Sequence, residues 1–418
     1  MTDSPAPTPT PTPAELDAAL ASALRSPSIV AGAELTRFPA RFDYGMTLGI
    51  DATAGGRLWS ASIAGGDNHL GFVVLRRSDD GGCTWSDPVT LVNAGNAGDP
   101  LRRRSLVAAV WVDPRNRLWL FVDQSVTYFD GRAGTWALTS PDADADTLVW
   151  STPRRIGDGA LLNKPIVLAD GSWVAAGSLW DRTRIEAGQP EATAPWAVNP
   201  FRDRFGDLDE HRGAWVRRSR DEGRSWEHTA TIRFEPPEFD EPRLVQRTDS
   251  ALWLTARIAA GGLAETIGDP TATLWEPPRP SPGIRQPSSR HALERLRSGA
   301  LLLVKNGSEL HRPAPGHGRS ELTAYLSHDD GATWTSGLLL DGRSKVSYPD
   351  IAQLPDGRIC VSYDHNRRTD GQVLLARFTE DAITRARPDR VERSVISQPD
   401  PAARDARLHR ESTPHGNA

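Results

Sequence analysis

An eight-residue turn sequence that occurs three times constrains the fold of this chain more than any other feature. It reads Ser-x-Asp-x-Gly-x-(Thr/Ser)-Trp and occupies residues 78–85, 219–226 and 327–334, each time after an apolar, β-prone run. An Asp and a Gly at this spacing between two strands predict a tight hairpin turn. The Ser and Asp side chains are expected to bond turn amides, and the Trp to pack on the core. Three copies predict a repeat architecture.

A second, shorter pattern supports the repeat. A small turn residue followed by an apolar pair occurs at six places about 50 to 80 residues apart, a spacing that fits one four-stranded propeller blade plus loops. These places are Gly56-Arg57-Leu58-Trp59, Asn116-Arg117-Leu118-Trp119, Asp170-Gly171-Ser172-Trp173, Asp249-Ser250-Ala251-Leu252-Trp253, Ser298-Gly299-Ala300-Leu301-Leu302 and Asp356-Gly357-Arg358-Ile359. We therefore predict an all-β fold, a six-bladed β-propeller of four-stranded antiparallel blades. A β-sandwich is the alternative, but sandwiches do not repeat an eight-residue turn together with its Trp.

The long turns fall between these short hairpins, in the later hairpin of a blade. Gly134-Thr135-Trp136 and the segment from Asp269 to Trp275 look like degraded copies in two further blades. The long turns are expected at the outer edge of the blades, away from a ligand.

The composition and the two chain ends limit which class of protein this chain can belong to. Charged residues make up 25% and hydrophobic residues 38% of 418 residues, as in an ordinary soluble protein. The net charge of −5 argues against nucleic-acid and anionic-membrane partners. We expect a disordered Pro/Thr-rich tail and a short helix over residues 1–33, the propeller over 34–397 and a disordered tail over 398–418. The N-terminus lacks the basic and apolar stretches of a secretory signal, which predicts a cytoplasmic protein.

The long turn is the Asp-box, or BNR repeat, and through it the chain resembles the sialidase (neuraminidase) superfamily, whose fold is a six-bladed propeller. The resemblance covers about residues 40–380, and the motifs together look like a divergent bacterial branch of BNR-repeat "sialidase family" proteins. Sialidases cleave glycosides whose anomeric carbon carries a carboxylate, which would repel a carboxylate nucleophile. They use a Tyr activated by a Glu instead, an Asp as general acid, and three Arg residues that clamp the substrate carboxylate.

The resemblance implies three catalytic residues in this chain. Tyr348, in a Ser-Tyr-Pro-Asp segment before the last short hairpin, matches the nucleophile. Glu241, in a Phe-Asp-Glu-Pro segment one strand before a hairpin, matches the Glu that activates it, with Asp240 as a rival carboxylate. Asp67, just before the strand that enters the first long turn, matches the acid. A buried core Tyr and ordinary loop carboxylates are the alternative reading.

The resemblance also implies two of the three clamp arginines. Arg257 ends the hairpin after the candidate base, and Arg319 lies on the strand that enters the third long turn. The first clamp arginine is missing, because residues 46–48, Met-Thr-Leu, stand where sialidases carry an Arg-Ile-Pro segment. Arg37 and Arg41 lie upstream and fill the gap only if the chain takes a different path.

Further polar residues are candidates for ligand contacts that ordinary sialidases lack. Lys164, in an Asn-Lys-Pro segment between blades, is one of only three lysines in the chain. Arg290 and His291 open a strand in a Ser-Ser-Arg-His segment, where they are suited to bind an acidic sugar or move a proton. The segment Asp364-His365-Asn366-Arg367 follows the last predicted strand and is expected at the rim of the same face. A solvated turn is the alternative for Lys164, and solvent-facing strand-end positions are the alternative for Arg290 and His291.

Three functions remain open from the sequence. The first is a glycoside hydrolase resembling exo-α-sialidases, which removes a terminal acidic sugar with the three catalytic residues above. The second is a lyase or atypical glycosidase for uronate polysaccharides, with His69, His291, Tyr348 and Arg290 supplying the base and the neutralising charge. The third is a non-catalytic carbohydrate-binding propeller, since a fold does not fix a function. The expected partner is a carbohydrate in every case. No metal or other cofactor is expected, because no His, Asp or Glu cluster has ligand spacing.

Overall fold

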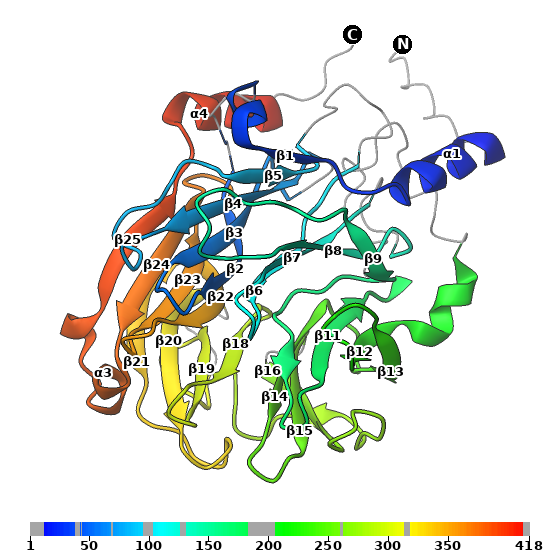
Figure 1. Ribbon diagram of the computed structural model, residues 1–418. Coiled ribbons are helices and arrows are strands. Elements are labelled where there is room, and N and C mark those ends of the chain that lie inside the picture. The colour runs from blue at the N-terminus through cyan, green and yellow to red at the C-terminus, as the bar shows by residue number, and fades with distance from the viewer. Residues whose placement is uncertain are drawn as a thin grey trace, which may run out of the picture.

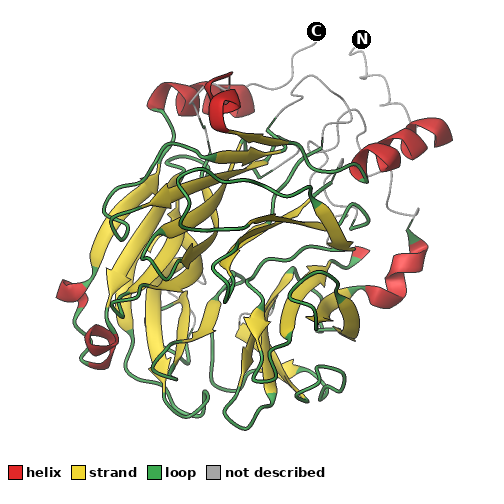
Figure 2. Cartoon of the chain, in the orientation of Figure 1, coloured by secondary structure: helices red, strands yellow, loops and turns green. Residues whose placement is uncertain are grey.

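Strands dominate the chain and helices are few (Figure 2). The computed structural model describes residues 12–37, 42, 44–67, 70–94, 103–125, 131–182, 205–259, 262–312 and 318–412. The strands form six antiparallel sheets that follow one another around a ring (Figure 1). The predicted six-bladed β-propeller is therefore confirmed.

Each blade is a meander whose first strand lies nearest the centre of the ring, where β2 contacts both β6 and β22. The first blade holds β2 (Met46–Ala52), β3 (Leu58–Ala64), β4 (Phe72–Ser78), β5 (Thr90–Val92) and an added edge strand, β1 (Ile29–Ala31). The second and third hold β6 (Ala108–Val112), β7 (Leu118–Asp123), β8 (Thr135–Ser140), β9 (Arg154–Gly157), β10 (Ile166–Val167), β11 (Trp173–Leu179), β12 (Gly213–Ser219) and β13 (Glu227–Ile232). The fourth holds β14 (Asp240–Gln246), β15 (Leu252–Ile258), β16 (Gly262–Gly268) and β17 (Arg279–Pro280). The last two hold β18 (Ala292–Arg295), β19 (Leu301–Asn306), β20 (Ser320–Ser327), β21 (Leu338–Ser344), β22 (Val346–Gln353), β23 (Ile359–His365), β24 (Gln372–Phe378) and β25 (Glu392–Ser397).

The six short hairpins join the first strand of each blade to the second, as their spacing predicts. Each tip needs a residue with positive φ, which Gly adopts at little steric cost and which other residues adopt less often. The tip residues are Gly56, Asn116, Gly171, Ser250, Gly299 and Gly357, with φ between 61° and 91°.

The long turns join the third strand of a blade to the fourth. In the first copy, Ser78 Oγ donates to Asp80 Oδ1 at 2.8 Å and accepts the Gly82 N–H at 2.8 Å. Asp80 also accepts the Thr84 N–H at 2.9 Å and the Thr84 hydroxyl at 2.6 Å. The same bonds occur in the other two copies. Side chains thus satisfy the backbone donors of the turn, which explains the fixed spacing.

One of the two expected degraded copies is found where it was predicted. Asp269 follows β16 and accepts the N–H groups of Thr273 and Leu274 at 2.8 and 2.7 Å. The other prediction is wrong, because residues 134–136 lead into β8 and do not form the turn after it. That turn instead uses Asp142, which accepts a nearby backbone N–H.

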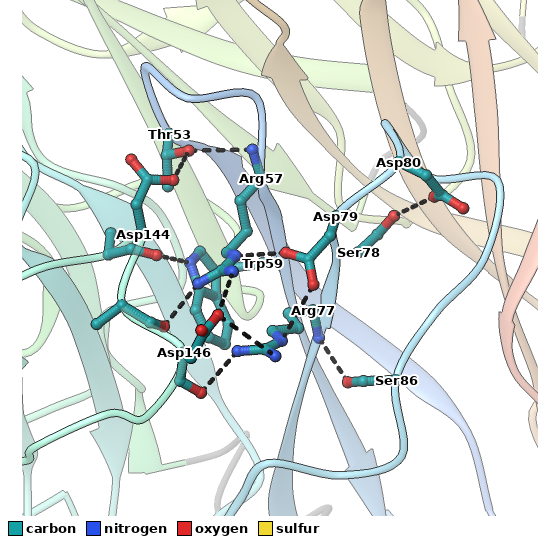
Figure 3. A network of polar contacts seen from close by, with 12 residues as sticks. Thr53, Arg57, Trp59, Arg77, Ser78, Asp79, Asp80, Ser86, Asp144 and Asp146 are labelled. Atoms are coloured by element: carbon teal, nitrogen blue, oxygen red, sulfur yellow. Dashed lines mark hydrogen bonds and ion pairs between the residues drawn. The ribbon is translucent and has the colours of Figure 1, made fainter.

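The two kinds of turn lie at the same ends of the strands, and in the first blade both contact the second blade (Figure 3). Arg57, in the first short hairpin, donates to Asp79 at 2.5 Å and to the Ala145 carbonyl of the second blade at 2.6 Å. Arg77 donates to the Asp146 carbonyl at 2.7 Å. These contacts stabilise the junction between the first two blades.

The chain ends differ from the expected boundaries. The helix α1 (Pro13–Ala23) is capped by Thr12 and buries Ala19 and Ala23 against the second and third blades. The strand β1 extends the first blade, so ordered structure begins before residue 34. The expected disordered tail contains the helix α4 (Pro401–Ser412). The remaining helical elements of the described residues are η1 (Gly32–Arg37), η3 (Gly206–His211), α3 (Glu380–Thr384) and η5 (Pro388–Arg390). Within the described ranges, no helix is long and apolar enough to cross a membrane.

Candidate active site

The candidate site lies at the face of the propeller opposite the turns. In an antiparallel meander, the first strand begins, the second ends and the third begins at the same face. Tyr348 and Glu241 lie near the starts of the first strands β22 and β14. Arg257 lies near the end of the second strand β15, and Arg319 immediately precedes the third strand β20. Asp67 lies in the loop from β3 to β4, so four blades contribute to one end of the central channel.

A cavity of about 310 Å³ opens at this end. Its polar lining consists of Tyr44, Asp67, Glu241, Arg257, Arg290, Arg319, Tyr348, Arg367 and Arg368, and its apolar lining of Met46, Leu48, Leu106, Val107, Leu162, Trp180 and Phe239. The structure thus brings together the three predicted catalytic residues and three of the predicted binding residues, Arg257, Arg290 and Arg319. The other two, Lys164 and His291, do not line this cavity.

Tyr348 and Glu241 reach the cavity through matching irregularities in their strands. The pairing register shifts over residues 240–243 of β14 and over residues 347–350 of β22. A proline follows both residues, and proline has no N–H to give to the ladder. Both residues also adopt positive φ, 45° at Glu241 and 55° at Tyr348. Bulges and left-handed backbone of this kind re-aim side chains and cluster at functional sites.

Tyr348, Glu241 and Arg257 form the polar centre of the cavity. The Tyr348 hydroxyl donates to Glu241 Oε1 at 2.7 Å, and Arg257 Nη1 donates to Glu241 Oε2 at 3.0 Å. Arg257 Nη1 also lies 3.4 Å from the Tyr348 hydroxyl. Its other nitrogens donate to Glu238 at 3.2 Å and to Ser288 Oγ at 2.9 Å. Two carboxylates therefore fix this guanidinium, and one oxygen of Glu241 is left to the tyrosine.

The charges around Glu241 favour its ionised form. Burial alone would raise its pKa, but Arg257 and the hydrogen bond from Tyr348 outweigh burial and hold the pKa below its usual range. Burial and the Glu241 carboxylate raise the pKa of Tyr348, against the opposing charges of Arg257, Arg367 and Arg319. At neutral pH the pair is a neutral phenol bonded to a carboxylate, which is the state in which the carboxylate accepts the phenol proton.

Three further guanidinium groups surround the Tyr348 ring. The Cζ atoms of Arg367, Arg319 and Arg290 lie 3.7, 5.3 and 5.8 Å from the ring centroid. Arg319 donates to one backbone carbonyl at 3.1 Å, and no carboxylate of the described ranges lies within ion-pair distance of it. The buried Nε of Arg290 has no hydrogen-bond partner in the part of the chain described. Clustered guanidinium donors without partners favour an anionic ligand.

Asp67 is the exposed carboxylate at the rim of the cavity. Burial and the charge of Asp67 raise the pKa of Tyr44 inside the cavity, although Arg367 opposes them. Residues 68 and 69 lie outside the described ranges, so the structure does not place the predicted base His69.

Lys164 lies in the interior of the central channel, away from the Tyr348 cavity. Its Nζ donates to the Ile50 carbonyl at 3.1 Å, contacts the Ile351 carbonyl and lies 2.8 Å from Glu294. It lines a separate cavity of about 500 Å³ that extends toward the β14–β15 hairpin. Lys164 therefore joins neighbouring inner strands and does not face the same space as Tyr348.

His291 and Asp240 also point elsewhere. His291 is fully buried, and its Nε2 lies 2.8 Å from Thr255 Oγ1. Burial and two neighbouring arginines lower its pKa well below the usual value, so the ring stays neutral. Asp240 lines another cavity, and burial raises its pKa to about 8. Glu241, and not Asp240, is the carboxylate that meets Tyr348.

The place of the missing clamp arginine is apolar. Met46 and Leu48 line the cavity, whereas the Thr47 hydroxyl turns away and donates to Ser362 Oγ at 3.2 Å. Arg37 is the last residue of η1 and does not line the cavity, and Arg41 lies outside the described residues.

Arg367 is the cavity residue that the sequence indicated least. The sequence predicts only that the segment from Asp364 to Arg367 lies at the rim, whereas the structure places the Arg367 guanidinium against the Tyr348 ring. The only available signal was an Asp three residues before it, Asp364, and such a pair is common in loops. The approach to the tyrosine depends on the path of the loop after β23.

The sequence matches the family model of the BNR repeat-like domain over residues 56–361, which is most of the chain. The chain belongs to the BNR repeat-like domain family. The matched range begins at the first short hairpin and ends within β23, so it includes all three Asp-box turns of this BNR repeat-like protein. No curated protein is significantly similar to the sequence.

Solved structures similar to this BNR repeat-like protein include several sialidases. A Hadza microbial sialidase gives a TM-score of 0.60 at 18% identity, over 83% of this chain and 69% of that chain. The intramolecular trans-sialidase from Ruminococcus gnavus gives 0.58 at 12% identity, over 82% and 96%. The Trypanosoma rangeli sialidase gives 0.53 at 14% identity, over 82% and 56%. The BNR repeat-like protein thus shares the sialidase fold.

Proposed function

We propose that this protein is a retaining exo-glycosidase that hydrolyses a terminal sugar bearing a carboxylate, sialic acid or a related acid. One observation carries the proposal: the Tyr348 hydroxyl donates to Glu241 at 2.7 Å inside a cavity lined by five arginines. A tyrosine bonded to an ionised carboxylate is an activated nucleophile, and arginines recognise carboxylate ligands. The family match and the sialidases among similar structures support the same class of reaction.

In the first step, the Tyr348 oxygen forms a bond to the anomeric carbon while its proton passes to Glu241. The bond between the anomeric carbon and the leaving oxygen breaks, and Asp67 protonates that oxygen. The phenol is neutral before the transfer, so it approaches a carbon that bears a carboxylate without the repulsion that a carboxylate nucleophile would meet. Arg257 lies 3.4 Å from the hydroxyl and stabilises negative charge that develops there.

In the second step, water displaces Tyr348 from the anomeric carbon. Asp67, ionised after the first step, takes a proton from that water, and Glu241 returns its proton to the tyrosine. Two displacements at one carbon retain the configuration of the sugar. The exposed position of Asp67 at the cavity rim supports this role, because leaving group and water both pass there.

A uronate lyase finds less support at this site. Its candidate base His291 is buried outside the cavity, and His69 lies outside the described residues. Tyr348 and Arg290 remain for that chemistry. The products separate the two reactions, because elimination yields an unsaturated uronate that absorbs ultraviolet light.

The test is a screen of sialosides and uronic glycosides with the wild type and Tyr348→Phe. We expect the wild type to release the free acid with retained configuration, as followed by NMR, and Tyr348→Phe to lose about 10³-fold or more of the rate while it still binds the sugar. Tyr363→Phe is the matched control, because Tyr363 is a buried tyrosine that donates to Asp341 outside the cavity.

Three outcomes contradict the proposal in different ways. Full activity of Tyr348→Phe would show that Tyr348 is not the nucleophile. An ultraviolet-absorbing product indicates elimination. Tight binding without turnover of any substrate indicates a carbohydrate-binding propeller. Since similar structures include intramolecular trans-sialidases, the products are also examined for anhydro sugars.

A further inference from the structure

Asp364 holds the Arg367 side chain in a fixed position. Its Oδ1 accepts Arg367 Nε at 2.9 Å and the Ser347 hydroxyl at 2.7 Å, and Ser347 Oγ accepts Arg367 Nη2 at 3.0 Å. Its Oδ2 accepts the Thr47 N–H at 3.3 Å. Asp364 therefore ties Arg367 both to the residue before Tyr348 and to the strand segment that lacks the first clamp arginine.

The loop that carries Arg367 is itself well bonded. The Asn366 carbonyl accepts the N–H groups of Thr369, Asp370 and Gly371 at 2.9 to 3.0 Å. The Asn366 side chain donates to Asp370 at 2.7 Å, and its backbone adopts a φ of 49°, which Asn tolerates better than most residues. A guanidinium on such a loop binds a ligand with a smaller loss of conformational entropy.

Much of the Arg367 hydrogen-bonding fork is unused. An arginine has five N–H donors in one plane. In Arg367 only Nε and Nη2 have partners in the described part of the chain. The Tyr348 ring contacts the guanidinium with its Cζ 3.7 Å from the centroid and takes none of the N–H donors as a hydrogen-bond acceptor. The Nη1 edge therefore remains for a ligand in the cavity that Arg367 lines.

Arg257 is less free than Arg367 to bind a ligand. Its nitrogens already donate to Glu241, Glu238 and Ser288. Arg319 makes one hydrogen bond to a backbone carbonyl and no ion pair in the described ranges. Arg290 also keeps a donor, its buried Nε, without a partner among the described residues, but its Nη2 donates to the Leu48 carbonyl at 2.8 Å and lies 3.5 Å from Asp350. Arg319 and Arg367 are thus the less buried cations with spare donors next to the nucleophile.

We propose that Arg367 replaces the missing first clamp arginine and, together with Arg319, binds the carboxylate of the substrate. This inference rests on the proposed function in one respect, the acidic sugar. The clamp is supplied from the loop after β23, on the same blade as Tyr348, instead of from β2. Asp364 is the positioning residue that orients Arg367.

The test combines one substitution with one chemical change in the ligand. Calorimetry measures the binding of 2-deoxy-2,3-didehydro-N-acetylneuraminic acid and of its methyl ester, which differ in the charge of the carboxylate. Glucuronic acid and its methyl ester form a second pair of probes. The proteins are the wild type, Arg367→Met, Arg367→Lys and the control Arg343→Met. Arg343 is also held by a nearby carboxylate, Asp341, but lies outside the cavity.

We expect Arg367→Met to weaken binding of the acid by about 10- to 100-fold and binding of the ester by less than about threefold. Arg367→Lys keeps the charge but loses the planar fork, so its loss is intermediate. Arg343→Met binds both probes as the wild type does. Thermal unfolding verifies that each variant is folded. If Arg367→Met does not fold, the acid and the ester are compared on Arg367→Lys instead.

Equal losses for acid and ester would show that Arg367 only supports the Tyr348 ring, and they overturn the inference. Unchanged binding of the acid overturns it as well. A wild type that binds none of the acids overturns both this inference and the acidic substrate. A wild type that binds an acid through Arg367 but never turns over a glycoside leaves the inference standing and refutes the hydrolase alone.

Discussion

In the interior of the channel, Arg243 and Asp350 are each 2% exposed, and Arg243 has partners at all three guanidinium nitrogens. It donates to Asp350 at 3.0 Å and to the backbone carbonyls of His291 and Pro349 at 2.9 and 3.3 Å. In the cavity at the end of the same channel, Arg319 makes one hydrogen bond. Both regions are built from arginines and carboxylates around the central channel, and they differ in how many donors are already used.

This difference distinguishes charged groups that stabilise the fold from charged groups that are available to bind a ligand. Asp350 accepts the Ile50 N–H at 2.9 Å, and Lys164 contacts the carbonyls of Ile50 and Ile351, so the channel charges join β22 of the last blade to β2 of the first. Saturated charges of this kind have nothing left for a ligand. The guanidiniums around Tyr348 keep donors unused, which is useful only if a ligand supplies the acceptor.

Glu241→Gln tests the cavity side of the comparison and has the largest expected effect. Gln keeps the shape of the side chain but does not take the tyrosine proton, so we expect the rate on the best substrate to fall about 10²- to 10⁴-fold. Glu238→Gln is the control, because Glu238 also pairs with Arg257, at 3.2 Å. An equal loss in both variants would assign the effect to Arg257 and not to proton transfer. Steady-state kinetics measure both.

Arg243→Met and Arg319→Met compare the two regions directly. Arg243→Met leaves the buried Asp350 without its closest cation, so we expect the free energy of unfolding to fall by about 3–5 kcal/mol. Arg319→Met removes a cation with no ion-pair partner in the described ranges and should cost less than about 1 kcal/mol while it weakens sugar binding. Denaturant unfolding and calorimetry measure the two quantities. Similar destabilisation by both substitutions would refute the distinction between saturated and unsaturated arginines.

The turns made the fold predictable because each turn needs particular residues at fixed spacing. Asp80 must meet the amides that follow it, and the hairpin tips need residues with positive φ. These are local requirements, so the sequence displays them. The turn after β8 was missed because it has an Asp, Asp142, but lacks the Gly and Trp of the repeat, and Asp142 accepts the N–H two residues on instead of four.

The candidate site was predictable where it follows from the ends of strands. Tyr348, Glu241 and Arg257 reach one cavity because the meander brings those ends together. Arg290 and His291 are neighbours just before β18, and extended backbone sends successive side chains to opposite sides, so only Arg290 reaches the cavity. The prediction that both would do so neglected this alternation.

Arg367 and the C-terminal tail were beyond this reasoning for different reasons. The position of Arg367 follows from the bonds of Asp364 to Arg367 itself and to two other segments, at Ser347 and Thr47, which no local pattern reveals. The tail was expected to be disordered from its Pro, Arg and His content, yet Ala, Arg and Leu at 402–408 are good helix formers, and α4 results.

The carboxylates of the Asp-box turns extend the comparison to the exposed surface. Substitution of one of them, Asp80, has the smallest expected effect. Burial opposes ionisation of Asp80, but the hydrogen bonds from Thr84, Ser78 and the Cys83 N–H together outweigh it and lower its pKa to about 2. A carboxylate with a lowered pKa in the folded state stabilises the fold above about pH 4, and this contribution is lost as the pH falls toward 2. Because the turn is exposed, we expect Asp80→Asn to cost less than about 1 kcal/mol at pH 7 and the cost to shrink between pH 5 and pH 3. Denaturant midpoints of wild type and variant over that range measure it. A cost that stays constant over this range would mean that the turn is held by its shape and not by the charge of Asp80.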